Sequence, residues 1–297
     1  METKTRSESE CSSDDSYAWT LTITPHLGWF DLRLKELWSY RDLIGLFVRR
    51  DFVAVYKQTI LGPLWFLIQP VMTTLIFTLI FGRVAKIPTD GVPPILFYLA
   101  GVTAWTYFAN CLNKTSNTFV GNANIFGKVY FPRLAIPISV VISNLIAFGI
   151  QFLMFLGFVA YFYVFGSKGS VINPNIWILS LPLLILQMGL LGLGFGIIIS
   201  SLTTKYRDLV QLVAFGVQLW MYLTPIVYPM SQLPAKWQAI MAWNPMAPVV
   251  ETFRYAFLGA GTVNLGHCAT GFFTTLVVLF VGMSLFTRVE KDFMDTV

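Results

Sequence analysis

The segment Val48–Gly82, VRRDFVAVYKQTILGPLWFLIQPVMTTLIFTLIFG, contains the three features that decide the fold. It begins with a basic amphipathic stretch, reaches a Gly62-Pro63 pair, and continues as an uncharged apolar run. Adjacent glycine and proline residues are typical of turns. The apolar run is long enough to enter a bilayer, because about 20 helical residues cross about 30 Å of hydrocarbon. The segment therefore predicts a surface helix, a corner and a membrane-spanning helix in succession.

The composition of the whole chain is that of a membrane protein. Hydrophobic residues make up 56% of the 297 positions and charged residues only 12%, whereas a soluble domain carries about 25% charged residues. Six long intervals contain no Asp, Glu, Lys or Arg: 58–82, 91–113, 134–167, 169–204, 209–235 and 255–287. Strands of membrane barrels are only about 10 residues long and alternate in polarity. The intervals therefore predict an all-α membrane protein with six transmembrane helices.

The expected spans lie at approximately 63–81, 94–112, 135–164, 176–201, 209–228 and 268–286. Before the last span, the apolar piece Trp237–Val250 is interrupted by Asn244-Pro245 and Pro248. It is too short to cross a membrane and favours a re-entrant helical hairpin. The expected domains are a disordered acidic tail (1–30), an amphipathic interface helix (31–61), a transmembrane domain (62–287) and a second tail (288–297).

Lys and Arg residues are unequally shared between the two sides of the membrane. If both termini lie inside, the inner segments hold 15 of the 20 Lys and Arg residues and the outer segments hold five. Positive residues concentrate in cytoplasmic loops, so both termini are expected in the cytoplasm and the hairpin outside. The basic residues lie beside apolar runs, so topology explains the pI near 9.1 and no nucleic-acid partner is expected.

The segment 31–60 is expected to form a helix on the cytoplasmic membrane surface. At helical spacing, apolar residues gather on one face, and Arg49, Arg50 and Lys57 lie on the opposite face, as in interfacial helices over anionic lipid. Asp51 falls within the apolar face, which predicts a specific partner for its carboxylate. A simpler alternative is that the basic residues only orient the first span.

The sequence lacks the groupings that enzymes and ion-coupled carriers use. The histidines, His26 and His267, are far apart, and the three cysteines have no metal-ligand or disulfide spacing. Gly121–Val129 has five residues between its glycines, where a phosphate-binding loop has four, and ends in valine instead of Ser or Thr. The cores of the spans also lack the charged residues of ion-coupled carriers. We therefore expect no catalytic residue, metal, cofactor or ATP hydrolysis in this chain.

An ordered set of short motifs resembles the permease subunits of type-2 ABC exporters, which move O-antigen, capsular polysaccharide or teichoic acid polymers. The motifs are YKQTILGPLW (56–65) followed by Gln69-Pro70, KVYFPR (128–133), YRDL (206–209), TPIVYP (224–229), NPM (244–246) and ETFR (251–254). The resemblance covers approximately Leu43–Val289. It implies the fold of these exporters and a location in the bacterial inner membrane.

The resemblance also implies partners. These are a second copy of this chain in a homodimer, two copies of a separate ATP-binding-cassette ATPase subunit, membrane lipids and a lipid-linked polysaccharide as substrate. The ATPase would contact the interface helix and the loop between the second and third spans. The coupling residues would be Arg49, Arg50, Asp51, Lys57, Lys128, Tyr130, Phe131 and Arg133. The alternative for this loop is that it only closes a turn.

Two charge pairs and several aromatic residues complete the expected site. Arg207 and Asp208 would brace the short inner turn. Glu251 and Arg254, three residues apart on one helical face, would brace the outer region. Sugars present C–H faces that stack on aromatic rings, so a glycan passage is expected to use Trp65, Phe66, Tyr98, Trp105, Tyr107 and Phe108. The alternative for these aromatics is an interfacial belt and helix packing.

The sequence thus predicts the permease half of an ATP-driven exporter for a lipid-linked polysaccharide. One alternative is an exporter of lipids or drugs with the same general fold. Another is a membrane enzyme acting on lipid-linked sugars, which the missing core carboxylates and histidines disfavour.

Overall fold

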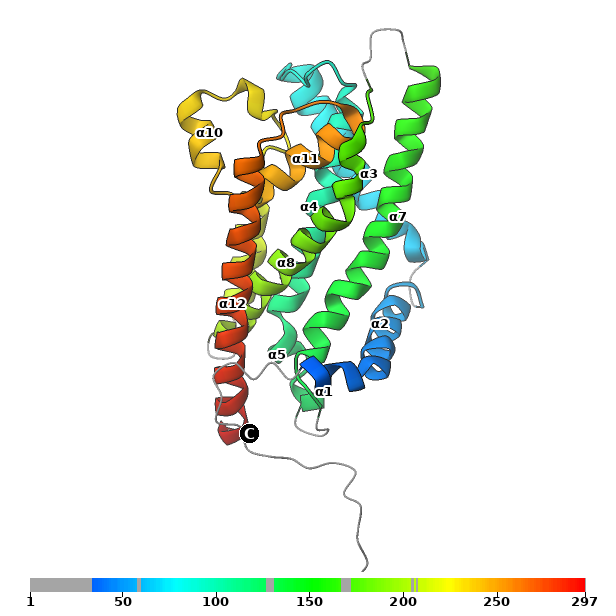
Figure 1. Cartoon of the computed structure of the whole chain (residues 1–297). Coiled ribbons are helices and arrows are strands. Elements are labelled where there is room, and N and C mark those ends of the chain that lie inside the picture. The colour runs from blue at the N-terminus through cyan, green and yellow to red at the C-terminus, as the bar shows by residue number, and fades with distance from the viewer. Residues whose placement is uncertain are drawn as a thin grey trace, which may run out of the picture.

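The computed structural model describes residues 34–57, 60–126, 131–166, 172–203, 206 and 208–296. Within these residues the chain is helical and forms no β-strand (Figure 1). The elements are α1 (Leu34–Ser39), α2 (Arg41–Tyr56), η1 (Gly62–Leu64), α3 (Trp65–Phe77), η2 (Thr78–Val84), α4 (Pro94–Ser116), α5 (Thr118–Gly121), α6 (Ala123–Phe126), α7 (Ala135–Phe165), η3 (Ile176–Ser180), α8 (Leu181–Thr203), α9 (Leu209–Leu223), η4 (Met230–Gln232), α10 (Ala235–Met241), α11 (Met246–Leu258) and α12 (Leu265–Thr296). The acidic tail expected over 1–30 lies outside the described residues.

Five segments in the described part of the chain are long and apolar enough to cross a membrane. They are Gly62–Val84, Pro94–Ser116, Ala135–Phe165, Ile176–Thr203 and Leu265–Val289. They coincide with five of the six expected spans. The remaining expected span, 209–228, is helical only over Leu209–Leu223. Its helix stops because Thr224 is extended, with φ −94° and ψ 144°, and the residue before a proline disfavours the helical region.

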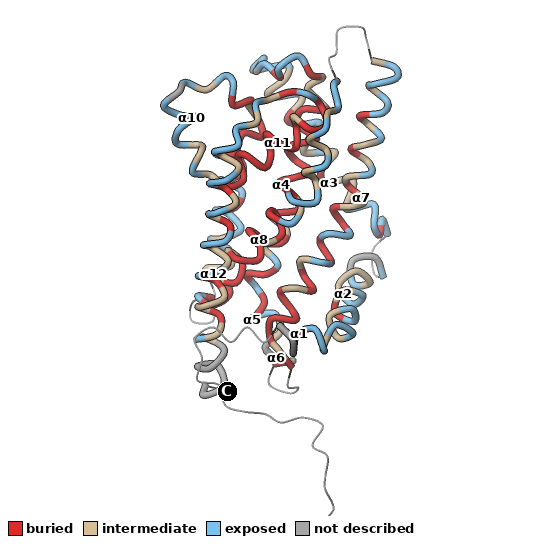
Figure 2. The backbone as a smooth tube through the Cα atoms, viewed as in Figure 1, coloured by how far each residue is buried: buried red, intermediate tan, exposed pale blue. Residues whose placement is uncertain are grey.

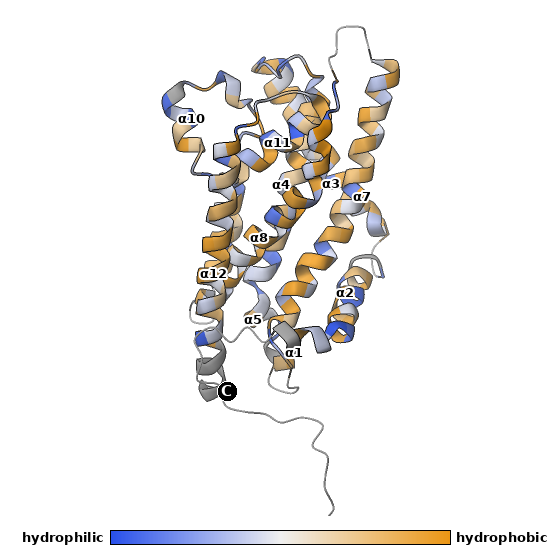
Figure 3. Cartoon of the chain, viewed as in Figure 1, coloured by the Kyte–Doolittle hydropathy of each residue, from blue (hydrophilic) through white to orange (hydrophobic). Residues whose placement is uncertain are grey.

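The centre of the bundle is formed by α4 and α8. In α4, 78% of the residues in the most apolar segment are buried, compared with 17% in Gly62–Val84. Helix α8 packs against α4 and also against α12. Figure 2 shows buried residues concentrated along α4, α8 and α11. Figure 3 shows mainly hydrophobic residues along α7 and α12, whose exposed apolar side chains suit contact with lipid.

Glycines on α8 allow its close approach to α4. A Cβ added to Gly192 would lie 2.7 Å from the Cβ of Cys111, and one added to Gly196 would lie 2.5 Å from the Cβ of Thr115. Neither space would hold a methyl group without moving a helix. Small residues allow this kind of packing in membranes, where dispersion contacts replace the hydrophobic driving force.

The two ends of the bundle carry different elements. Helices α1, α2 and α5 lie at the end where α12 finishes, and α10 and α11 lie at the opposite end (Figure 1). As the sequence predicts, the chain turns at Gly62, which has φ +48°, and Pro63 occupies the first turn of η1, where its missing N–H costs nothing. The single helix expected over 31–60 is divided at Tyr40, which separates α1 from α2.

The close packing of α8 on α4 is tested by Gly196→Ala. We expect this substitution to destabilise the protein by about 1–3 kcal/mol, because an added methyl group overpacks the contact with Thr115. The measurement is the fraction of monodisperse protein that remains after heating in detergent. The matched control is Gly157→Ala on α7, where an added Cβ meets nothing within 4 Å. Equal heat resistance of the two variants would contradict the packing argument.

Candidate functional site

Four phenylalanine rings join α2 to the segment between α4 and α7. We call Phe47, Phe119, Phe126 and Phe131 the aromatic joint. The ring centroids of Phe47 and Phe131 are 5.7 Å apart, and those of Phe126 and Phe131 are 5.8 Å apart. Phe119 also stacks on Phe286 of α12 at 4.9 Å. All four rings of the joint are buried. Helix α2 is therefore packed onto the bundle and not merely attached through the chain.

Charged residues surround this joint. Arg49, Arg50 and Lys57 are exposed, as the helical pattern predicts. The Arg50 guanidinium lies 4.9 Å from the centre of the Phe47 ring and pairs with a carboxylate oxygen of Asp51 at 2.8 Å. Asp51 also lies close enough to Lys114 of α4 to interact with its charge, and the specific partner expected for Asp51 stays a prediction. Arg133 is buried, at 6% exposure, and lies 5.5 Å from the centre of the Phe126 ring.

Three of the expected site residues, Lys128, Tyr130 and Arg207, lie outside the described residues. Asp208 precedes α9 directly, and its side chain makes no capping hydrogen bond to that helix. The expected pair of Arg207 and Asp208 therefore stays a prediction.

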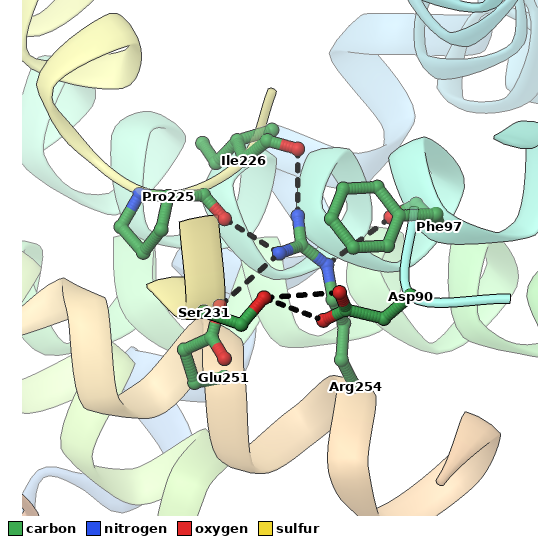
Figure 4. A network of polar contacts seen from close by, with 7 residues as sticks. All are labelled: Asp90, Phe97, Pro225, Ile226, Ser231, Glu251 and Arg254. Atoms are coloured by element: carbon green, nitrogen blue, oxygen red, sulfur yellow. Dashed lines mark hydrogen bonds and ion pairs between the residues drawn. The ribbon is translucent and has the colours of Figure 1, made fainter. Parts of the chain in front are cut away.

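At the opposite end of the bundle, Arg254 of α11 is the centre of a buried polar network (Figure 4). Its side chain has no exposed surface. The two Nη atoms donate to the carbonyl oxygens of Pro225 and Ile226, each at 2.6 Å. Its Nε donates to the carbonyl oxygen of Phe97 at 3.3 Å, and the ring of that residue lies 3.7 Å from the guanidinium carbon. The arginine thus links α11 to α4 and to the chain that follows α9.

Carboxylates complete the Arg254 network. Glu251 Oε1 accepts from Arg254 Nη1 at 3.4 Å, so the two residues form the ion pair that their spacing suggests. Burial raises the pKa of the Glu251 carboxyl, and the charge of Arg254 opposes this rise. Asp90 accepts a hydrogen bond from the Ser231 hydroxyl at 3.0 Å and lies close enough to Arg254 to interact with its charge. The sequence indicated the ion pair, whereas the carbonyl partners come from distant segments.

Helices α3, α4 and α9 enclose a second polar feature, a pocket of about 150 Å³. We call it the amide pocket. Its polar lining residues are Gln69, Thr73, Thr106, Asn110, Asn113 and Gln218. Gln69 and Gln218 are exposed, so the pocket opens on the surface of the single chain. Asn113 Oδ1 is buried, with no hydrogen-bond partner among the described residues. The lining contains amides and hydroxyls but no charged side chain.

The six aromatic residues expected along the glycan passage occupy different environments in the structure. Trp105 lines the amide pocket and makes an edge contact with Trp220 at 6.0 Å. Trp65 is half-exposed, and Phe66 stacks on Phe52 at 6.5 Å. The other three aromatics, Tyr98, Tyr107 and Phe108, are packed in the interior, with exposures of 0%, 3% and 0%. The interior three therefore pack helices together in this structure and do not line the pocket.

The sequence-based prediction did not include the amide pocket, because it was built on charged and aromatic residues. The available signal was the spacing of neutral polar residues within charge-free spans. Gln69 and Thr73 are four residues apart, and so are Thr106 and Asn110, which places each pair on one helical face. What the sequence could not provide is the neighbouring arrangement of three helices that makes these faces converge.

Comparisons with known proteins give consistent results. The family model described as "ABC-2 type transporter" matches residues 42–258. The O-antigen export system permease protein RfbA of Klebsiella pneumoniae is 29% identical over 255 residues, which cover 86% of this chain and 94% of that protein. The polysialic acid transport protein KpsM of Escherichia coli is 24% identical, with coverage of 78% and 87%. The inner membrane transport permease YadH of E. coli K12 is 24% identical, with coverage of 88% and 94%.

The buried network predicts a large effect of Arg254→Leu. Removing one partner of a buried ion pair typically costs about 3–5 kcal/mol, and this change also leaves the Pro225 and Ile226 carbonyl oxygens without their donor. We expect a strong loss of heat-resistant, monodisperse protein in detergent. Arg254→Lys should keep more heat-resistant protein than Arg254→Leu, because an ammonium donates hydrogen bonds but lacks the planar fork of arginine.

The control for this prediction is Arg41→Leu, in which the lost side chain is 61% exposed. We expect its melting behaviour to match that of the unaltered protein. If Arg254→Leu and Arg41→Leu were equally stable, the Arg254 network would not hold the three segments together.

Proposed function

The chain belongs to the ABC-2 type transporter family, and we propose that it is the permease subunit of an ATP-driven exporter of a lipid-linked polysaccharide in a bacterial inner membrane. The names of the O-antigen and polysialic acid relatives support this substrate class. The structural observation that carries the proposal is the amide pocket. A neutral polar surface within apolar helices requires a polar neighbour, because an unsatisfied polar group in hydrocarbon costs several kcal/mol.

The chemistry of the amide pocket suits a carbohydrate. Amide and hydroxyl groups both donate and accept hydrogen bonds, as sugar hydroxyls do. Trp105 adds an aromatic surface beside these groups. In the proposed exporter, two copies of the chain face each other, and the pockets open onto the passage between them. Weak, repeated contacts then let a long polymer move without one tight binding step.

ATP hydrolysis is proposed to come from a separate ATPase, present in two copies, because the sequence lacks a phosphate-binding loop. The exposed basic residues of α2 form the proposed docking surface, and the buried Phe131 and Arg133 are proposed as coupling residues behind it. These parts lie at the same end of the bundle (Figure 1). The aromatic joint connects them through the contact of Phe47 with Phe131, so a force on α2 is transmitted by ring contacts to the segment that precedes α7.

The proposed topology follows from this docking surface. Both termini and α2 are placed in the cytoplasm, and α10 and α11 are placed on the outer side as a re-entrant hairpin. Helix α9, with its extended continuation from Thr224, is proposed as the fifth of six crossings. Its 15 helical residues are fewer than the roughly 20 needed for a full crossing. Non-helical backbone at this depth is tolerated where protein surrounds it, and Arg254 binds the carbonyls of that continuation.

A second candidate function is export of a lipid or drug. It is favoured by the similarity to YadH, whose name gives a transport permease without a substrate. The two functions differ in whether a polymeric glycan crosses the membrane. The transport experiment below separates them.

The docking surface is tested by reversing charges on α2. We expect the double variant Arg49→Glu with Lys57→Glu to bind the ATPase roughly tenfold more weakly, the effect of about 1.4 kcal/mol. The measurement is co-purification of the ATPase with the tagged permease at graded salt. Arg83→Glu with Lys86→Glu, which changes the same number of exposed charges at the end of η2 and just after it, is the matched control. Weakening of both variants to the same degree would contradict docking on α2.

The passage is tested by filling the amide pocket with Ala109→Trp. In vesicles holding permease and ATPase, the assay measures the ATP-dependent appearance of glycan to an added glycosidase. We expect the rate to fall at least roughly tenfold, which corresponds to a barrier higher by about 1.4 kcal/mol, while the ATPase still co-purifies. Ala160→Trp, at an exposed position on α7, should leave the rate unchanged.

Three results would count against the proposal. Unchanged export by Ala109→Trp would remove the amide pocket from the passage. Export of a lipid or drug without any glycan movement would favour the second candidate. ATP hydrolysis by the purified permease alone would exclude a separate energy source.

A further inference from the structure

Two pockets adjoin each other beside α11. The first, here called the acidic pocket, has a volume of about 180 Å³ and is bounded by η4, α10, α11 and the start of α12. The second, the apolar pocket, measures about 330 Å³ and is bounded by η3, α8, α11 and α12. Pro248, Thr252 and Cys268 line both. The pockets therefore share a wall made by α11 and α12.

The apolar pocket opens among membrane-facing side chains. Leu183 and Leu265 line it and are 52% and 69% exposed. Both belong to segments that are apolar enough to cross a membrane. The floor contains Gln187, whose Nε2 is buried with no hydrogen-bond partner among the described residues. A hydrocarbon chain fits this almost entirely apolar lining.

The acidic pocket contains the buried carboxylate of Glu251. Glu251 is 4% exposed, and its Oε1 pairs with Arg254. Its Oε2 is buried and makes no hydrogen bond of good geometry in the described part of the chain, although the backbone N–H groups of Met230 and Thr262 lie near enough to stabilise the carboxylate. This oxygen lies against Gly261, where an added Cβ would be only 2.6 Å away. Arg254 directs both Nη atoms to backbone carbonyls, so it compensates the carboxylate only in part.

The remaining lining of the acidic pocket mixes apolar side chains, among them Met230 and Met241, with polar groups and with the imidazole of His267. Gln238, Thr262 and Asn264 contribute amide and hydroxyl groups. A positive group is therefore favoured beside Glu251, and hydrogen-bonding oxygen atoms are favoured around it. An engineered cavity of about 150 Å³ holds one benzene ring, so the acidic pocket is the right size for a small head group.

We propose that the two pockets together bind one membrane lipid with an ammonium-bearing head group. The ammonium lies in the acidic pocket near Glu251, and one acyl chain lies in the apolar pocket between α8 and α12. The carboxylate selects this head group over an anionic one. The bound lipid would fill the space between α11 and the ends of α8 and α12. The inference depends on the chain being a membrane protein and not on which molecule it exports.

The experiment uses the full-length protein in nanodiscs with two photoactivatable lipids. One is a phosphatidylethanolamine and the other a phosphatidylglycerol, both with the same diazirine-bearing acyl chain. Cross-linked peptides are identified by mass spectrometry. We expect phosphatidylethanolamine to label residues 177–187 and 265–272 about fivefold more than phosphatidylglycerol, a preference of about 1 kcal/mol.

Substitutions separate specific binding from general lipid contact. Ala269→Trp fills the apolar pocket and should abolish the preferential labelling. Phe273 lies one turn further along α12 and is 68% exposed. Phe273→Trp should therefore retain the preferential labelling. Glu251→Gln should equalise labelling by the two lipids. If that variant does not fold, Thr262→Lys replaces an exposed pocket residue and should reverse the preference in favour of the anionic lipid.

Three outcomes would overturn the proposal. The first is equal labelling of these segments by the two lipids in the unaltered protein. The second is unchanged labelling in Ala269→Trp. The third is displacement of the label by a soluble monosaccharide, which would assign the acidic pocket to a sugar.

Discussion

A fully buried guanidinium imposes the strongest constraint on this structure. Removing such a charge from water is costly unless its donors are satisfied, and Arg254 satisfies them with carbonyl oxygens of two other segments. Those carbonyls are available because Thr224-Pro225 ends α9 and leaves backbone acceptors without helical donors. Space for the side chain exists because Gly101 of α4 has no Cβ, which would lie 2.7 Å from Nη2. The break after α9, the glycine in α4 and the position of α11 therefore depend on one another.

The features that the sequence predicted well are those set by neighbouring residues. Charge-free runs gave five of the spans, because crossing length and apolarity are properties of a continuous segment. The turn at Gly62-Pro63 could also be predicted, because it depends only on these two adjacent residues. Helical spacing predicted the basic face of α2. Phe47, on the opposite apolar face, is buried as this pattern predicts. The exception in that helix was the division at Tyr40, for which the sequence offered neither glycine nor proline.

The features that the sequence did not predict depend on convergence of distant segments. Arg254 was expected to pair with Glu251, but three of its four hydrogen bonds reach carbonyl oxygens 28 to 157 positions away. Backbone acceptors carry no side-chain signature. Aromatic residues posed a different difficulty, because a ring suits a sugar passage and a helix interface equally. Burial decided between these uses for Tyr98, Tyr107 and Phe108, which lie inside the bundle.

The two ends of the molecule are joined by α4. Its first turns supply the Phe97 carbonyl to Arg254, and near its last turn the Lys114 ammonium donates to Asn144 Oδ1 of α7 at 3.0 Å. Helix α7 in turn packs against α2, which the aromatic joint holds through Phe47 and Phe131. A continuous series of contacts thus runs from the basic surface of α2 to the buried network under α11. Because α4 also forms a wall of the amide pocket, a displacement of α2 that moved α4 would change the pocket and the Arg254 network together.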